Sequence, residues 1–185
     1  MSLTKIIYPD YDSFVSSKNT GTNYGTADYI SAGDSNVDDD QTRAFIKFSY
    51  TTIPRGSTIT GAVLNLTIKT DVATLATNKT VCAANSSWSS STITWANQPT
   101  IGSALVTVAF GANDSGVKSF TLPTNTIISY YKGLATDNGF CIDTPSMGNN
   151  SEDMYRFHSL EAVTESNRPN IVITYNPPVN RSMFI

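Results

Sequence analysis

Tyrosines with neighbouring amide and carboxylate side chains are the residues whose types could support recognition chemistry. Sugar rings stack their CH-rich faces on exposed aromatic rings, and sugar hydroxyls form hydrogen bonds with planar polar groups. Each tyrosine taken alone also fits a place in the core or at the base of a loop. We predict a carbohydrate-binding surface from Tyr8, Tyr11, Tyr24, Tyr29, Asn23, Asp28 and Tyr155, with Tyr130, Tyr131, Asn138 and Asn149 as further candidates.

An acidic segment alternates oxygen-bearing side chains in the manner of the first positions of a calcium loop. Hard cations such as Ca²⁺ bind several carboxylate and amide oxygens within one turn of chain. The segment is not an EF-hand, because Asp39 stands at the glycine position and Phe45 at the position of the bidentate glutamate. The alternative is a solvated polar turn between strands. The candidate ligands of a weak calcium site are Asp34, Asn36, Asp38 and Asp40.

Catalytic groups are scarce. His158 is the only histidine of the chain, and the Gly-x-Ser-x-Gly pattern of a nucleophile elbow does not occur. A histidine-rich zinc site is therefore excluded, and a Ser-His-Asp triad has one candidate base. We interpret His158 as structural and predict that the protein is not an enzyme and requires no cofactor, with Ca²⁺ as the optional ion.

Charge and hydropathy narrow the possible partners. The formal net charge is −3, and lysine and arginine form no cluster. Nucleic acids and anionic membranes need a basic patch, so neither is an expected partner. The N-terminus has no apolar signal-peptide core. The sequence also contains no run of about 18 apolar residues, the length that would suggest membrane insertion. If the protein acts outside the cell, we expect it to arrive there as part of a larger particle, by another export route, or as an excised mature domain.

Alternating hydrophobicity predicts the strands that must position these groups. Thr58–Ile68 places Ala62, Leu64, Leu66 and Ile68 on one face, and Thr42–Tyr50 alternates similarly. One segment, Asn125–Leu134, has helical spacing with Thr124 or Asn125 as its N-cap. We predict an all-β, antiparallel, jelly-roll-like β-sandwich with one short helix covering an end. The domain should span residues 1–176, with a tail at 177–185.

Two residue pairs invite structural interpretation. Cys82 and Cys141 both lie in apolar strand-like runs, which favours two buried free thiols over a disulfide. Trp88 and Trp95, separated by a serine-rich stretch, suit either the anchor of a core or a stacking platform for a sugar.

The order of short motifs along the chain resembles the DNRLRE domain. The motifs include Asn23-Tyr24-Gly25, the run from Arg43 to Phe48, Ile53-Pro54-x-Gly56, Thr92-Ile93-Thr94-Trp95-x-Asn97-Gln98-Pro99, Phe157-x-Ser159-x-Glu161 and Arg168-Pro169-x-Ile171. The resemblance runs from about Tyr8 to Tyr175. It implies a β-sandwich module of bacterial, archaeal and phage surface proteins, with glycan binding in some members.

This resemblance sharpens three expectations. Trp88 and Trp95 become structural, with Trp95 inserted under the sandwich and Trp88 pinning its loop. Arg43 and Glu161, which recur in the pattern, should form a partly buried pair. We expect a non-catalytic extracellular, cell-surface or virion module that binds a polysaccharide or surface glycan. The alternative is a structural or receptor-contacting subunit that assembles with other subunits of a phage virion or surface assembly.

Overall fold

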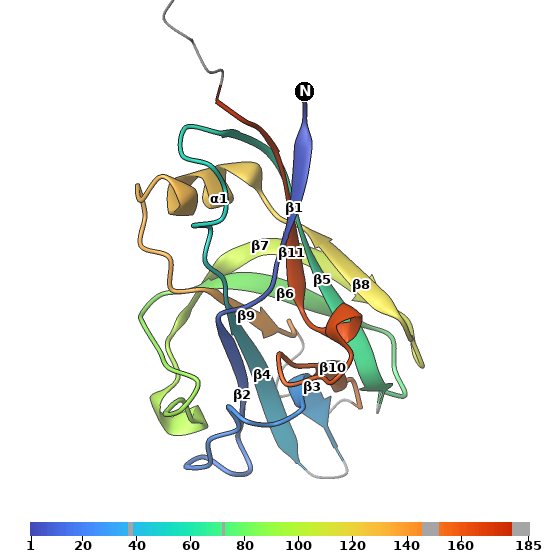
Figure 1. Ribbon diagram of the computed structural model, residues 1–185. Helices are drawn as coiled ribbons and strands as arrows, with labels where there is room; N and C mark the ends of the chain where they lie inside the picture. Colours follow the sequence, from blue (N-terminus) through green and yellow to red (C-terminus); the bar gives the residue numbers. More distant parts are fainter. Residues whose placement is uncertain (37–38, 72, 146–151, 179–185) are drawn as a thin grey trace, which may run out of the picture.

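The computed structural model describes residues 1–36, 39–71, 73–145 and 152–178 (Figure 1). These residues form eleven strands, all paired antiparallel, one α-helix and two short 3-10 helices. In chain order the elements are β1 (Leu3–Ile7), β2 (Tyr11–Ser16), β3 (Tyr29–Ser35), β4 (Asp40–Lys47), β5 (Thr58–Asp71), β6 (Thr77–Ala84), η1 (Trp95–Asn97), β7 (Ile101–Phe110), β8 (Val117–Thr121), α1 (Thr124–Tyr131), β9 (Phe140–Asp143), β10 (Tyr155–His158), η2 (Glu165–Asn167) and β11 (Asn170–Asn176).

The strands form a curled sheet that encloses the core between two faces. Their order is β1-β11-β5-β10-β3-β4-β9-β6-β7, with β2 paired to β4 and β8 paired to β5. One face supplies Leu64, Phe120 and Ile171, and the facing strands supply Ile46 and Ile142, all in one hydrophobic cluster. The predicted all-β antiparallel sandwich with one short helix is confirmed. The assignment of residues 1–176 to one domain stays a prediction, and residues 179–185 of the predicted tail lie outside the described residues.

Strand β5 shows how the sequence pattern produces this core. Ala62, Leu64 and Leu66 are at most 1% exposed, whereas the intervening Val63 and Asn65 are half-buried. Successive strand side chains point to opposite faces, so the alternation directs one row into the core. The inward row predicted for Thr58–Ile68 is confirmed for these three residues, and the strand continues to Asp71.

The predicted helix is present but is displaced at both ends. It spans Thr124–Tyr131, with Pro123 as the N-cap residue, and packs on β5 through the buried Ile127. Gly133 adopts φ +66, a left-handed conformation that commonly follows a helix end. Leu134 is consequently outside the helix and 74% exposed, so its predicted place on the apolar face was wrong. No helix among the described residues has the length and apolar character needed to cross a membrane.

A second, smaller cluster lies on the other face of β4. Phe45 points away from the main core and packs with Val15, Ile93, Ala84 and Cys141. Trp88 and Trp95, both half-buried, pack against this cluster. The two indoles therefore cover the outer face of β4, in agreement with their predicted structural role.

Candidate functional site

Two adjoining hollows flank a pair of tyrosines at the C-terminal end of α1. The first has a volume of about 520 Å³ and is lined by the end of β4, the loop that follows it, and Asp137. The second has a volume of about 690 Å³ and lies towards Gly56 and Gly133. Arg55, Tyr130 and Tyr131 line both hollows. We call this region, centred on Tyr50, Tyr130 and Tyr131, the tyrosine cleft.

The β4–β5 connection holds the Tyr131 ring in place. The Tyr131 hydroxyl donates a hydrogen bond to the Pro54 carbonyl oxygen and accepts one from the Ser57 backbone N–H at 3.1 Å. Pro54 cannot continue a strand ladder because it has no N–H donor, so the chain turns there. The Tyr130 ring lies 6.1 Å from the Phe140 ring, measured between centroids. Two segments far apart in sequence thus set the positions of the paired rings.

An ion pair lines the wall of the cleft. Lys47 Nζ lies 2.6 Å from Asp137 Oδ2, and the two side chains are 18% and 15% exposed. The other oxygen of Asp137 accepts a hydrogen bond from the Gly139 N–H at 2.9 Å. Gly139 has φ +84, and a Cβ there would lie 2.5 Å from the Ile46 carbonyl oxygen. The close approach of this turn to β4 therefore requires glycine.

Tyr50 provides a buried hydroxyl that has no hydrogen-bond partner among the described residues. Its side chain lines the first hollow, the residue is 7% exposed, and its hydroxyl makes no hydrogen bond to the described residues. Burial raises the pKa of Tyr50 well above its ordinary value, and Asp137 adds to the rise. Buried polar groups are nearly always hydrogen-bonded. A hydroxyl in this position is therefore suited to a partner that enters the cleft.

A comparison with known families decides the class of protein. Residues 4–175 match carbohydrate-binding module family 96. The chain belongs to this family. A search of curated proteins found no match. The family is one of non-catalytic binding modules, which agrees with the scarcity of catalytic groups in the sequence. The matched residues run from β1 to β11 and include the whole tyrosine cleft.

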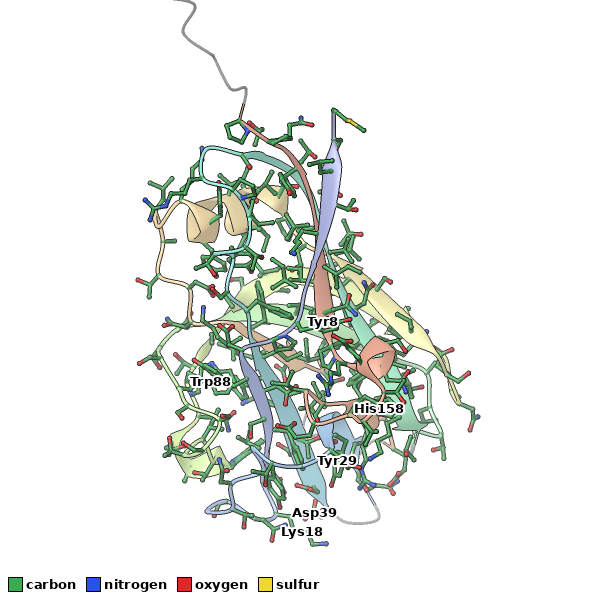
Figure 2. The ribbon with its side chains drawn as sticks, in the orientation of Figure 1. Tyr8, Lys18, Tyr29, Asp39, Trp88 and His158 are labelled. Atoms are coloured by element: carbon green, nitrogen blue, oxygen red, sulfur yellow. The ribbon has the colours of Figure 1, made fainter. Side chains whose placement is uncertain are left out.

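In this family 96 module, two of the predicted sugar-binding tyrosines meet in a different hollow, of about 220 Å³. The Phe14 ring stacks on Tyr24 and Tyr29 at centroid distances of 4.2 Å and 5.1 Å. The Arg156 guanidinium carbon lies 5.0 Å from the Tyr29 ring centroid, and Lys18 also lines the hollow. Figure 2 shows Tyr29 and Lys18 at the end of the module opposite α1. The two sites are thus separate.

Other predicted binding residues already have structural partners. The Asn23 amide donates hydrogen bonds to the carbonyl oxygens of Ser90 and Ile93, both at 2.7 Å, and so ties its loop to the tryptophan stretch. The Tyr11 ring meets Trp88 edge-on at 4.9 Å. The Asn23 side chain therefore holds a loop in place, and the Tyr11 ring already packs against the Trp88 ring.

The three remaining residues of that prediction are dispersed. Asp28 forms an ion pair with Lys69 at 2.5 Å. Tyr8 is half-buried directly after β1 and lies near the middle of the view in Figure 2. Tyr155 is fully buried, and its hydroxyl donates to the Gly111 carbonyl oxygen, so a surface ligand does not reach its ring. The structure joins Tyr24 and Tyr29 in one hollow and leaves Asp28, Tyr8 and Tyr155 outside it.

The described members of the predicted calcium set lie on two strands and a turn, with Asp34 in β3, Asn36 in the turn after it and Asp40 at the start of β4. Asp34 is buried at the end of β3, Asn36 is exposed, and Asp38 lies outside the described residues. Asp40 Oδ1 accepts a hydrogen bond from the Ser16 hydroxyl at 2.7 Å. Within the described parts of the chain, no group of three or more His, Cys, Asp or Glu side chains is placed to hold a metal ion. Calcium binding stays a prediction, which melting temperatures with calcium and with a chelator would test.

The predicted pair between Arg43 and Glu161 was wrong. Arg43 Nε instead donates to Asp143 Oδ1 at 3.0 Å, and the guanidinium carbon lies 5.5 Å from the Trp95 ring centroid. Glu161 is exposed after β10. Strand β4 pairs with β9, which ends at Asp143, so strand pairing brings this carboxylate to Arg43.

Sequence reasoning found part of the cleft and missed the rest. Tyr130 and Tyr131 were among the aromatic candidates, whereas Tyr50, Lys47 and Asp137 were not. The available signal was weak: Lys47 is a charged residue at the end of an apolar strand, and Tyr50 follows three residues later before a proline turn. Asp137 has no local signal, because only the pairing of β4 with β9 brings it to Lys47.

Proposed function

We propose that the module binds a polysaccharide chain in the tyrosine cleft and acts outside the cell without catalysing a reaction. Membership of carbohydrate-binding module family 96 supports glycan binding, and the cleft supplies suitable groups for it. The observation that carries the choice of site is the buried Tyr50 hydroxyl, which lacks a hydrogen-bond partner among the described residues and lines the hollow beside Tyr130.

The groups in the cleft match the chemistry of a sugar. An aromatic ring offers a stacking face for the CH groups of a pyranose, and Tyr130 is half-buried with the cleft on either side. The Lys47 ammonium and the Asp137 carboxylate are a donor and an acceptor for adjacent hydroxyls. Since hollows lie on both sides of the tyrosine pair, the arrangement suits consecutive units of a polymer better than one isolated sugar.

The extracellular location rests on the kind of ligand and on the motif resemblance. Polysaccharides of cell surfaces are reached from outside the cell, and the resemblance of the motifs to the DNRLRE domain implies a module of surface proteins. A receptor-contacting virion subunit would use the same cleft for host glycans. The binding experiment below therefore applies to either setting.

The test measures polysaccharide binding by calorimetry and on a glycan array, for the wild type and two variants. Tyr130→Ala removes a ring of the tyrosine cleft, whereas Tyr24→Ala removes a ring of the hollow at the opposite end. A lost stacking ring should weaken binding by about tenfold, so we expect that loss in Tyr130→Ala and unchanged affinity in Tyr24→Ala.

Melting temperatures of both variants establish that each remains folded. The reverse pattern of affinities would move the site to the hollow around Tyr24. Absence of binding by the folded wild type to every polysaccharide on the array would contradict the proposed function.

A further inference from the structure

Cys82 and Cys141 lie directly opposite each other on neighbouring antiparallel strands. In the pairing of β6 with β9, Cys82 is the partner of Cys141, and both thiols are free and buried. Opposed residues of antiparallel strands have Cα atoms about 4.5 to 5.5 Å apart. Disulfides span Cα distances of about 4.4 to 6.8 Å. The strand register therefore already supplies the spacing that a disulfide needs.

The two thiols also project from the same side of the sheet. The preceding pair in the same register, Val81 and Ile142, packs in the main core. Cys141 packs in the smaller cluster beneath the tryptophans, and so does Ala84, two residues after Cys82. Since alternate residues of a strand share a face, Cys82 belongs with Ala84 and Cys141 on the tryptophan side.

We propose that Cys82 and Cys141 are a modification site that forms an intramolecular cross-strand disulfide when the module meets a small-molecule disulfide oxidant. The link joins β6 to β9 and closes the long chain segment between them, which contains the tryptophan stretch, β7, β8 and α1. It is independent of what the tyrosine cleft binds.

The reaction is two successive thiol–disulfide exchanges. The thiolate of Cys82, which at 5% exposure is the less buried of the two residues, attacks one sulfur of the oxidant and releases one small thiolate. The Cys141 thiolate then attacks the Cys82 sulfur of this mixed disulfide and displaces the second small thiolate. Two protein thiols are oxidised, one oxidant disulfide is reduced to two thiols, and the two protons pass to the small thiolates or to solvent.

Burial of the two thiols limits the rate of thiol–disulfide exchange in the folded protein. Burial raises the pKa of the Cys82 thiol, with Asp143 adding to the rise and Arg43 opposing it. Burial likewise raises the pKa of Cys141 well above its ordinary value. Only the thiolate attacks a disulfide, so the folded protein should react slowly at neutral pH and faster as pH rises. Refolding in the presence of the oxidant avoids this barrier.

The experiment refolds the full chain from urea in a buffer of reduced and oxidised glutathione, and then counts thiols after denaturation. We expect wild type to lose both titratable thiols as a monomer, and proteolytic mass mapping to recover one peptide pair joined at Cys82 and Cys141. The melting temperature of this product should exceed that of the reduced protein by several degrees and return to the reduced value after treatment with a reductant.

Cys82→Ser and Cys141→Ser are the matched controls, because each keeps one thiol and cannot form the internal link. Neither should show an oxidant-dependent rise in melting temperature. Two free thiols, two glutathione adducts or disulfide-linked dimers in refolded wild type would each overturn the proposal. None of these results depends on glycan binding.

Discussion

Lys79 Nζ lies 3.3 Å from Asp153 Oδ1 and 2.7 Å from the Asp153 carbonyl oxygen, with the two side chains 0% and 2% exposed. The same carboxylate accepts hydrogen bonds from the Asp34 N–H at 2.9 Å and the Thr77 hydroxyl at 3.0 Å. Gly33 makes room for this arrangement, because a Cβ there would lie 2.7 Å from both Lys79 Nζ and Asp153 Oδ1. A buried charged pair is thus surrounded by hydrogen-bonding groups of the module.

Lys79→Met should destabilise the module strongly. Burial lowers the pKa of Lys79, which Asp153 opposes, so the pair offsets the cost of burying each charge. Removing one partner leaves an uncompensated buried charge, at a cost of about 3 to 5 kcal/mol. Urea denaturation measures this loss. Lys118→Met, which removes a partly exposed ion pair with Asp114, is the control and should lower stability much less. Equal effects of the two substitutions would contradict the importance of burial.

Asp12 should make stability depend on pH. Burial raises its pKa to about 7, a hydrogen bond from the Leu160 N–H at 2.8 Å opposes the rise, and Glu161 adds to it. The folded pKa exceeds the unfolded value of 3.8, so the protonated side chain stabilises the fold fully below that value. This contribution is lost as pH rises through about 7 and amounts to about 4 kcal/mol at most.

Asp12→Asn tests this linkage, because the amide oxygen can still accept from Leu160. We expect the variant to match the wild type at about pH 4 and to become the more stable protein between about pH 5 and pH 8. The measurement is the difference in free energy of unfolding across that range. A difference that stays constant with pH would contradict the raised pKa.

Gly139→Ala should be more damaging than an equivalent change at an open turn. Gly139 has φ +84 and a nearest contact of 2.5 Å for an added Cβ, whereas Gly116 has φ +76 and nothing within 4 Å. Gly116→Ala therefore measures left-handed strain alone, at about 1 to 2 kcal/mol, and Gly139→Ala should exceed it by about 1 to 3 kcal/mol. Thermal unfolding of the two variants provides the comparison, and equal losses would refute the steric requirement at Gly139.

Tyr50→Phe should raise stability and weaken polysaccharide binding. Removing a buried hydroxyl that has no partner among the described residues relieves a desolvation cost of about 1 to 3 kcal/mol, while the proposed ligand loses a hydrogen bond. Tyr131→Phe is the matched control, because its hydroxyl bonds to Pro54 and Ser57, and its loss should lower stability by about 1 kcal/mol. Denaturation and calorimetry on both variants are the measurements. A destabilised Tyr50→Phe protein would contradict the view that the Tyr50 hydroxyl is buried without a hydrogen bond in the unliganded fold.

Local sequence was sufficient for the strands and for the division of residues between faces. The alternation in β5 correctly identified Ala62, Leu64 and Leu66 as core residues, and the helical spacing near Ile127 located α1. These features depend on side-chain direction, which repeats with the period of each element. The C-terminal end of the helix was predicted too late in the chain, because Leu134 fits the helical spacing. Gly133 adopts a left-handed conformation one residue earlier and turns the chain out of the helix.

The class of fold and the strand faces were thus determined by the sequence itself, while partners across strands were decided only by the tertiary structure. Periodicity states which way a side chain points but not which strand lies beside it, since pairing joins residues far apart in the chain. Arg43 consequently meets Asp143 rather than Glu161, and Tyr155 is buried although its type suited a ligand. For the same reason the tyrosine cleft exists only after β4, its following loop and the end of α1 have come together.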